Sequence, residues 1–541
     1  MGYSRGGLIL STWAISTIMA GCAVSDPPLI GSPKQPHESG EQAEVHAVVA
    51  RRLNGSVNLV VGHRFTGPNF MNNVAGNPKD ITYDQSLPGG VSFRRGSSIN
   101  GWSYSANGAS WQAPGKVYPQ FVWGEPVAIL WSDPALAVGL TNPSLVAYAS
   151  LAVSRQAFDS VAGTSQTSLN GWPTTLTTPD GINLVDSVCV ALSFDGGVQF
   201  GDLTCIREPD IGDYGTDQTT VAIGAGGRVF VAADDFRTST TLGRLLLYEL
   251  VYTGASEPFL QKLPVDADME TYSRSPELRR DQSGVVWLSG MNDAGTVRLC
   301  QVTSDGCTYI GQVTTGAKVF ASLPAGVVTD KKLRSGVSAD FAVNRTQLAG
   351  STVREFIFVY SRVEPGGDPD ASRTYVGVTR CFRFGLEGVL SCQDIDAWGA
   401  RLRAGYQTQP RIEFVDKSPG QDGSGADWRY AFYEFGRDEI AQGHAQVTLA
   451  TLYGTLPSAA DPTVVFSPLP GPDPEVCPAY YEWQNAHYWG DYFALLAVPP
   501  VPGNANWRHL AIYSSDEQRG CVPSHPLQGR NLHVVAWGWV D

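Results

Sequence analysis

The stretch Cys189–Cys205, CVALSFDGGVQFGDLTC, combines an apolar strand, an Asp-Gly-Gly turn, an aromatic residue and a cysteine at each end. Within it, Ser193, Asp195, Gly197 and Phe200 form the pattern Ser-x-Asp-x-Gly-x-x-aromatic. A short acidic side chain can accept backbone N–H groups across a turn that glycine permits. We therefore predict an antiparallel hairpin that the two cysteines close with a disulfide.

The octapeptide SFDGGVQF resembles the Asp-box of bacterial neuraminidase repeats. The resemblance implies a hairpin between the third and fourth strands of a β-propeller blade, with the aromatic residue plugging the blade edge. In that family the box marks the fold and does not do the chemistry. A degenerate copy, YSANGASW, covers Tyr104–Trp111 and has Ala106 where the aspartate should be.

A group of three strand-like runs recurs seven times from Val45 onward. Its opening runs are VHAVVARR (45–52), WSDPALAV (131–138), TDQTTVAIG (216–224), SPELRRD (275–281), VSADFAV (337–343), PRIEFVD (410–416) and GDYFALLAV (490–498). Such repetition predicts an all-β protein with a single propeller of seven blades, and the likeness to neuraminidase-repeat propellers spans the same region. Six blades with a strand exchanged between the termini, or a pair of β-sandwich domains, are the alternatives.

The composition agrees with many short strands and turns. The 541 residues include 59 Gly, 35 Pro, 14 Trp, 21 Tyr and 21 Phe, and only 17% are charged. The net charge of −14 argues against nucleic acid or an anionic membrane surface as a partner. Adjacent basic pairs such as Arg279-Arg280 are predicted to be solvated.

The first 22 residues predict export. A basic residue, Arg5, precedes an apolar run over Leu8–Ala20, and the sequence Met-Ala-Gly-Cys that ends at Cys22 resembles a bacterial lipobox. We expect 1–22 to be a lipoprotein-type signal peptide, 23–44 a disordered tether and 45–541 the propeller. The protein would then lie at the bacterial cell envelope, on the outer membrane or cell surface, held by its lipid anchor only. An ordinary signal peptide with an incidental cysteine is the alternative.

The eight remaining cysteines predict a disulfide framework. Three pairs each bracket a glycine-containing turn between strand-like runs, and the last pair follows by elimination: Cys189–Cys205, Cys300–Cys307, Cys381–Cys392 and Cys477–Cys521. Neither a CxxC pair nor a His-Cys cluster occurs, so we predict no metal site and no cofactor. A structural calcium ion is left open.

Charged residues occupy corresponding places just before the opening runs. The carboxylates are Asp133, Asp217 and Asp491, and the guanidinium groups are Arg274, Arg334 and Arg411. Around one pocket, three arginines would hold a carboxylate-bearing sugar through bidentate hydrogen bonds. The simpler interpretation is that the aspartates cap turns and that the arginines fall in register by chance.

The loop YYEWQNAHYWGDY (480–492) concentrates aromatic rings beside ionisable groups, as sugar-binding sites do. Its candidate ligand-binding residues are His487, Tyr488 and Trp489, and the weak catalytic candidates are Tyr492, Glu482, Asp491 and Asp133. Alternatively, the rings of this loop fill the gap between blades.

The resemblance to sialidases implies a tyrosine nucleophile, a helping glutamate, an aspartate acid and three arginines. The Phe/Tyr-Arg-Ile-Pro motif of that family is absent, and the nearest strings are Phe93-Arg94-Arg95-Gly96 and Pro410-Arg411-Ile412. The leading hypothesis is therefore a monomeric, lipid-anchored propeller that binds a glycan or an envelope protein. An active exo-glycosidase acting on acidic sugars is the alternative, and a purely structural envelope protein is the third possibility.

Overall fold

The computed structural model describes most of the chain between residues 41 and 538. The described ranges are 41–66, 98–106, 111–116, 127–130, 133–154, 187–201, 203–206, 216–235, 243–252, 258–292, 294–315, 332–333, 339–348, 351–363, 374–385, 388–395, 399–403, 406–415, 427–435, 446–453, 463–468, 479–481, 486–488, 493–498, 508–515 and 531–538. Among these residues, no helix is long and apolar enough to cross a membrane.

The first half of the chain forms four antiparallel sheets. They are β1 (Glu41–Arg51), β2 (Val57–Thr66), β3 (Ser98–Ser105) and β4 (Trp111–Lys116); β5 (Val127–Leu130), β6 (Ala135–Val138), β7 (Val146–Ser154), β8 (Ser187–Ser193) and β9 (Thr204–Cys205); β10 (Thr216–Ile223), β11 (Val229–Asp235), β12 (Arg244–Val251) and β13 (Phe259–Lys262); and β14 (Arg274–Arg280), β15 (Val286–Met291), β16 (Thr296–Thr303) and β17 (Gly306–Thr314). A short helix, α3 (Ala267–Glu270), precedes β14.

Three further sheets follow in chain order, with a small separate sheet beside them. They are β19 (Ala339–Leu348), β20 (Ser351–Val363), β21 (Thr374–Phe384) and β22 (Ser391–Asp394); β23 (Tyr406–Val415), β24 (Asp427–Phe435), β25 (Gln446–Tyr453) and β26 (Thr463–Pro468); and β29 (Ala494–Val498), β30 (Arg508–Ser515) and β31 (Asn531–Gly538). The separate sheet joins β18 (Lys332–Leu333), β28 (Ala486–Tyr488) and β27 (Ala479–Tyr481).

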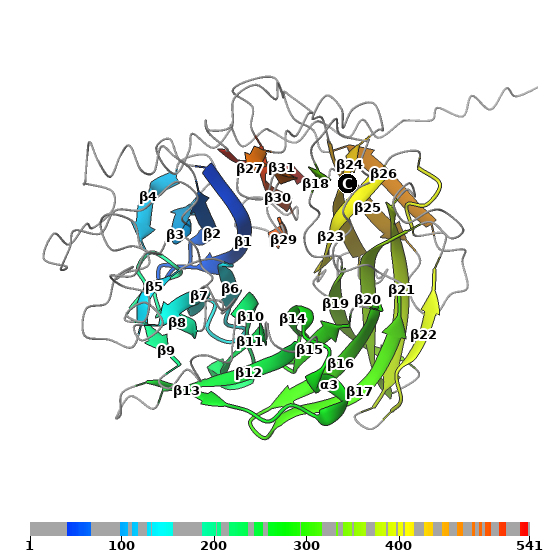
Figure 1. Cartoon of the computed structure of the whole chain (residues 1–541), viewed down its shortest axis with the longest axis horizontal. Coiled ribbons are helices and arrows are strands. Elements are labelled where there is room, and N and C mark those ends of the chain that lie inside the picture. Colours follow the sequence, from blue (N-terminus) through cyan, green and yellow to red (C-terminus); the bar gives the residue numbers. More distant parts are fainter. Residues whose placement is uncertain are drawn as a thin grey trace, which may run out of the picture.

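The sheets stand around a central opening, which makes the chain a β-propeller (Figure 1). The innermost strands β1, β6, β10, β14, β19, β23 and β29 each contact the next, and β29 contacts β1 again. In the second sheet, β5 and β6 both pair with β7, so two short pieces share the inner place.

Six of these sheets have four or more strands and are complete blades. This number matches the alternative considered from the sequence, and the favoured seven complete blades are not found in the described residues. The group of runs predicted as the seventh blade forms only the three strands β29–β31, which lie between β23 and β1. No strand exchange between the termini is seen there, because β1 pairs with β2, and β30 pairs with both β29 and β31.

Buried apolar side chains on neighbouring blades form the core between them. Where the ring closes, Val45 and Ala47 of β1 pack with Ala494 of β29 and Ile512 of β30. The apolar runs of β6 and of the second half of β10 are buried, whereas β14 (RSPELRR) carries charged side chains into the ring. Burial of these runs between the sheets is the main favourable contribution to the fold.

The three predicted hairpin disulfides are confirmed: they are Cys189–Cys205, Cys300–Cys307 and Cys381–Cys392. Each joins the third strand of its blade to the fourth. In two of the blades the cysteines face each other directly in the strand register. The predicted fourth disulfide, Cys477–Cys521, lies outside the described residues.

The turn between β8 and β9 has the hydrogen bonds expected from its residues. Asp195 Oδ1 accepts the backbone N–H of Val198 at 3.0 Å and that of Gln199 at 3.1 Å, and the Ser193 hydroxyl donates to the same oxygen. Gly197 has φ +82°, which other residues rarely adopt. Phe200 packs edge-on against Trp102, with ring centroids 5.1 Å apart, so this aromatic residue connects the second blade to the first.

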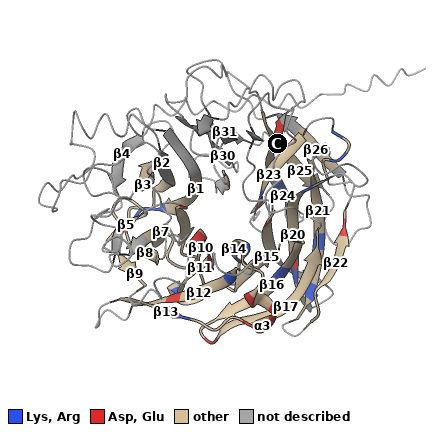
Figure 2. Ribbon diagram, viewed as in Figure 1, with Lys and Arg blue, Asp and Glu red and all other residues tan. Residues whose placement is uncertain are grey.

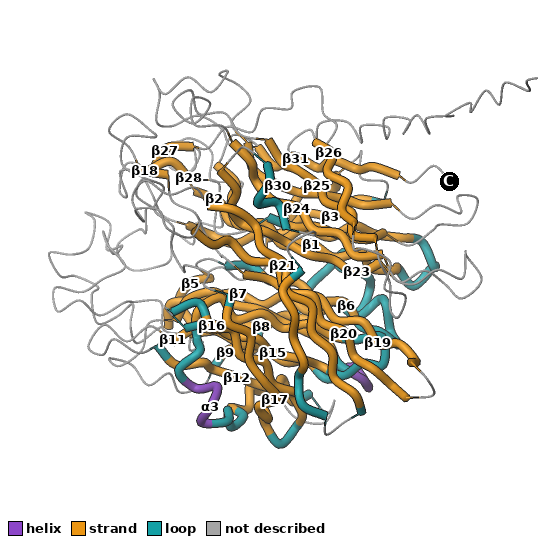
Figure 3. Tube along the Cα trace, turned by 90° about the vertical axis from the view of Figure 1, so that its right-hand side faces the viewer, coloured by secondary structure: helices purple, strands orange, loops and turns teal. Residues whose placement is uncertain are grey.

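The two ends of the ring differ. Because the strands alternate in direction, connections from a second strand to a third, and from one blade to the next, meet at one end, which we call the long-loop end. It includes the longest connections, 67–97 and 155–186. At the other, short-turn end, the hairpins are tighter, as between β16 and β17. Figure 3 views the ring from the side, with α3 at the long-loop end.

The inner strands begin at the long-loop end with a repeated irregularity. Asp133, Gln218, Ser275 and Gln409 have φ between 48° and 52°, although none is glycine. Three of them lie where the strand register shifts, as in a β-bulge. Side chains join these points across blades: the backbone N–H of Gln218 donates to Asp133 Oδ2 at 3.1 Å, and that of Ser275 donates to Gln218 Oε1 at 2.7 Å. These bonds link the second sheet to the third and the third to the fourth at the long-loop end of the ring.

Candidate functional site

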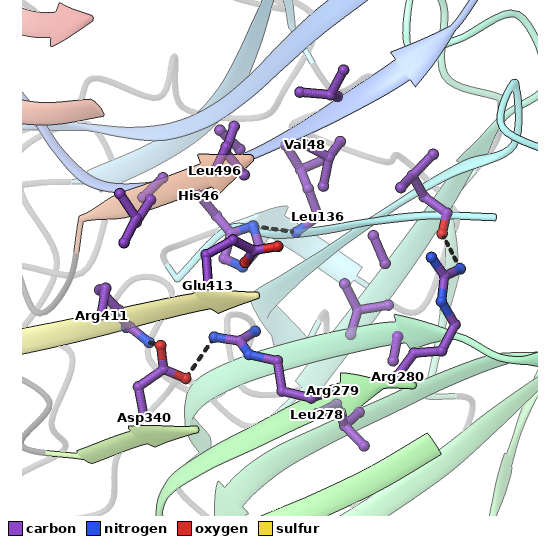
Figure 4. A pocket seen from close by; sticks show the side chains of 18 of the residues that line it. His46, Val48, Leu136, Leu278, Arg279, Arg280, Asp340, Arg411, Glu413 and Leu496 are labelled. Atoms are coloured by element: carbon purple, nitrogen blue, oxygen red, sulfur yellow. Dashed lines mark hydrogen bonds and ion pairs between the residues drawn. The ribbon is translucent and has the colours of Figure 1, made fainter. Parts of the chain in front are cut away.

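The inner strands enclose a cavity of about 370 Å³ at the centre of the ring. Residues from β1, β6, β10, β14, β19, β23 and β29 line it, so every sheet of the ring contributes. One side is apolar and includes Val48, Leu136 and Leu496, while charged side chains occupy the other (Figure 4). A cavity of this size holds a small molecule of one or two rings.

An ion-pair network forms the charged wall. Arg279 of β14 contacts Asp340 of β19 at 2.6 Å and Glu277 at 3.4 Å. Arg411 of β23 pairs with Glu277 and lies 3.8 Å from Asp340 Oδ2. Backbone N–H groups of Phe341 and Ile412 also donate to Asp340, at 2.8 and 3.0 Å. The network fixes both guanidinium groups beside the cavity.

Arg280 adds a third guanidinium group. It donates to the carbonyl oxygen of Val138 at 2.7 Å and to that of Ile223 at 3.1 Å. This side chain therefore bridges β6 and β10 and has no carboxylate partner among the described residues. Desolvation by burial lowers its pKa.

Glu413 carries the most unusual carboxyl group of the cavity. It projects from β23, and no hydrogen bond or ion pair reaches its carboxylate from the described residues. Burial raises its pKa from 4.5 to about 7, with Asp340 adding to the rise and Arg279 opposing it. Near neutral pH this group can therefore give up or accept a proton.

His46 of β1 faces the same cavity (Figure 4). Its Nδ1 accepts the backbone N–H of Leu136 at 3.2 Å, so the remaining proton of the neutral ring is on Nε2. Burial, together with Arg279 and Arg411, lowers its pKa from 6.5 to about 3. His46 is thus a neutral N–H donor at physiological pH.

The aspartates predicted at the start of the inner strands lie at the long-loop end. Asp133, which is 1% exposed, and Asp217 Oδ1 both accept the backbone N–H of Gln218 at 3.1 Å. These contacts agree with the simpler interpretation, in which the aspartates cap the strand start. A role in ligand binding stays a prediction for both residues.

The three predicted arginines do not share one described partner. Arg274 pairs with Asp234 of β11 at 3.2 Å, whereas Arg411 is in the cavity network. Arg334 lies outside the described residues. Figure 2 shows the acidic and basic segments of β10 and β14 bordering the central opening. Whether all three arginines face one ligand stays a prediction.

The aromatic loop is described only in part. Its residues His487 and Tyr488 lie in β28, which pairs in parallel with β18 at Lys332 and Leu333, immediately before Arg334. Glu482, Trp489, Asp491 and Tyr492 lie outside the described residues, so their roles stay predictions.

The sequence analysis missed most of the cavity residues. Arg279 and Arg280 were predicted to be solvated, and this was wrong, because Arg279 pairs with Asp340 and Arg280 donates to backbone carbonyl groups of β6 and β10 within the ring. Their place in the opening run SPELRRD is the signal that could have identified them. His46 and Glu413 are single residues within apolar runs, and only the closed ring brings them together.

The described residues offer little to a metal ion. No group of three or more His, Cys, Asp or Glu side chains in the described ranges is arranged to hold one. The carboxylate of Asp340 is instead engaged by guanidinium and backbone N–H groups.

The sheets define the chain as an all-β propeller. Several solved structures, sialidases among them, are similar to it at low sequence identity. No family model and no curated protein matches the sequence. The intramolecular trans-sialidase from Ruminococcus gnavus is 10% identical, covering 76% of this chain and 94% of that one, with a TM-score of 0.39. The leech intramolecular trans-sialidase is also 10% identical, covering 76% and 68%, with a TM-score of 0.39.

A protein of unknown function from Dyadobacter fermentans is 13% identical, covering 74% of this chain and 92% of that one, with a TM-score of 0.36. Similarity at this level concerns the fold alone. The chemistry of the cavity residues must therefore carry any functional argument.

Proposed function

We propose that this protein is an exported, lipid-anchored propeller that binds an acidic glycan in its central cavity. The observation that carries the proposal is the set of three guanidinium groups, from Arg279, Arg280 and Arg411, along one wall of a cavity lined by all the inner strands. Guanidinium groups recognise carboxylates through paired hydrogen bonds. The opposite wall, with Val48 and Leu496, suits the C–H face of a sugar ring.

The charge balance of the cavity favours an anionic ligand. Arg279, Arg280 and Arg411 carry three positive charges, and Glu277 and Asp340 carry two negative charges. One positive charge therefore remains when Glu413 is protonated. An entering carboxylate would neutralise that charge. At the long-loop end, Asp217 and Arg274 are partly exposed and could contact hydroxyl groups of the next sugar unit.

Binding can be tested with acidic and neutral glycans of equal size. Arg411→Lys keeps the positive charge but loses the planar fork of donors, so we expect at least a tenfold weaker affinity for the acidic glycan. A suitable control is Arg354→Lys, because Arg354 forms a comparably buried pair with Asp281, 3.0 Å away and outside the cavity. If both variants bind the acidic glycan equally well, the cavity is not the binding site.

A second function, exo-glycosidase activity, is favoured by one observation: the pKa of Glu413 is raised to about 7 by burial. A carboxyl group that stays protonated near neutral pH, near an ionised carboxylate such as Asp340, can act as a general acid. Turnover of fluorogenic glycosides, sialosides included, tests this function. Loss of hydrolysis in both Glu413→Gln and Tyr492→Phe would establish it, and no hydrolysis by the parent protein would leave binding as the function.

Lipidation at Cys22 would attach the protein to a bacterial membrane, and incorporation of labelled fatty acid that is lost in Cys22→Ser tests it.

The hydrogen bonds of Asp195 support the assignment of SFDGGVQF as an Asp-box. Peptide mapping without reduction tests the Cys477–Cys521 disulfide. An envelope protein as the natural ligand, in place of a glycan, would appear as binding that Arg411→Lys leaves unchanged.

A further inference from the structure

The inner strands are joined in pairs by a hydrogen bond from the backbone of one strand to a side chain of the strand before it. Three such bonds occur: His46 Nδ1 accepts the backbone N–H of Leu136 at 3.2 Å, Thr220 Oγ1 accepts that of Leu278 at 3.1 Å, and Asp340 Oδ2 accepts that of Ile412 at 3.0 Å. They connect the first sheet to the second, the third to the fourth and the fifth to the sixth. His46 and Thr220 are each the first paired residue after the register shift of their strand, so they occupy corresponding places.

This bond between strands does not require a histidine. Thr220 and Asp340 make it with a hydroxyl and a carboxylate on shorter side chains. Because His46 uses Nδ1 for the bond, its proton is on Nε2, at the far side of the ring. No described residue accepts that proton in a hydrogen bond. His46 is therefore longer than its structural task requires, and its second nitrogen is an unused donor.

The donor side of His46 is accessible from the cavity. His46 lines the cavity and is only half-buried, whereas Thr220 is buried and is not among the lining residues. In Figure 4 the ring of His46 points from β1 toward the charged wall that includes Arg279. A ligand held by the guanidinium groups would therefore lie within reach of Nε2.

We propose that His46 is a specificity-determining residue of the cavity and donates its Nε2–H to an uncharged oxygen of the ligand, a hydroxyl or ring oxygen of an acidic sugar. This inference rests on the proposed binding of an acidic glycan. The guanidinium groups recognise the carboxylate and do not distinguish a sugar acid from another acid of similar size. An N–H donor adds that distinction, because a ligand without the oxygen leaves the donor unpaired in a desolvated site.

His46 is suited to this task because it stays neutral. Burial, Arg279 and Arg411 lower its pKa to about 3, and Asp340 opposes them. The lining residues of β6 and β29, the strands that contact β1 on either side, are uncharged. The contribution of His46 to binding should therefore be equal at pH 6 and pH 8, although Glu413 titrates in that range.

The test compares methyl β-D-glucuronide with cyclohexanecarboxylate, in ligand-observed NMR titrations of the full chain. Both probes have a carboxylate on a saturated ring, but only the glucuronide has a ring oxygen and hydroxyl groups. His46→Asn keeps an oxygen for the Leu136 N–H and loses the donor. We expect it to bind the glucuronide about tenfold more weakly at both pH values and cyclohexanecarboxylate as the parent does. His46→Gln, whose amide N–H extends farther, should recover most of the affinity.

The matched control is Thr220→Val, which removes the corresponding bond in the third sheet and changes no residue of the cavity. It should leave both affinities unchanged. His46→Thr copies the arrangement at Thr220, and it repeats the test if thermal unfolding shows that His46→Asn does not fold.

Three results would overturn this inference and leave the cavity proposal in place. The variants without the donor could bind the glucuronide as tightly as the parent, they could weaken both acids equally, or Thr220→Val could weaken glucuronide binding as much as they do. Failure of the cavity proposal has a different signature: the parent binds neither acid, or Arg411→Lys leaves the affinity for both unchanged.

Discussion

Glu413→Gln should make the protein more stable at neutral pH, and the gain should vanish in acid. The pKa of this carboxyl is 4.5 in the unfolded chain and about 7 in the folded cavity, because burial disfavours the charged form. Between these values the folded protein binds more protons than the unfolded chain. The free energy of unfolding of the parent therefore falls as pH rises through this window.

The size of the effect follows from the width of the window. A shift from 4.5 to about 7 corresponds to at most about 3 kcal/mol of stability lost by pH 8. Glutamine has the shape of the protonated acid and loses nothing. The variant should therefore match the parent at pH 4 and exceed it by about 3 kcal/mol at pH 8, which for a chain of this size is about 3 °C in Tm.

Urea unfolding curves at several pH values measure this difference directly. The control is Asp305→Asn, which removes a carboxylate that is exposed in a turn at the short-turn end and lies outside the cavity. A stability gain for Glu413→Gln that is equal at pH 4 and pH 8, or a loss at pH 8, would refute the view that the cavity strains an ionised Glu413.

Three further changes test the fold. Replacing Cys381 and Cys392 by serine opens a loop whose cysteines are 11 residues apart and should cost about 3 kcal/mol in urea unfolding, with no loss if the bond is absent from the purified protein. Gln218→Gly should be more stable than Gln218→Ala by about 1 kcal/mol, because φ 50° disfavours a Cβ atom; equal values would contradict the left-handed bulge. Gly197→Ala should cost at least about 2 kcal/mol in thermal or urea unfolding, since its Cβ would lie 2.4 Å from Val60 Cγ2, and an unchanged stability would contradict the packing of this turn.

Local features were predictable from the sequence. The Cys189–Cys205 disulfide and the turn around Asp195 depend on residues within one hairpin, where the spacing of glycine, aspartate and cysteine is enough to define them. The opening runs were also recognisable, because most of them contain a short apolar run such as ALAV (135–138) or ALLAV (494–498). The number of complete blades was harder to predict from the sequence, because fourth strands such as β22 are short, exposed and poor in apolar residues.

The cavity could not be predicted, because its residues are far apart in the chain. His46, Arg279, Asp340 and Glu413 belong to four different sheets, and their contacts depend on the closure of the ring. The pKa of Glu413 follows from burial at that closure and from no neighbour in sequence. Arg411 was selected from the sequence as a candidate, but its partner Glu277 was not.

The contact between the first and last sheets has a consequence for the order in which the protein can mature. Val45 and Ala47 are among the first core residues to be synthesised, yet Ala494 and Ile512, which cover them, are among the last. The three hairpin disulfides need only neighbouring strands and can form as soon as each hairpin has been synthesised. The earliest sheet must therefore wait with an uncovered apolar face until the rest of the polypeptide arrives, and during that wait it is the part most in need of a chaperone.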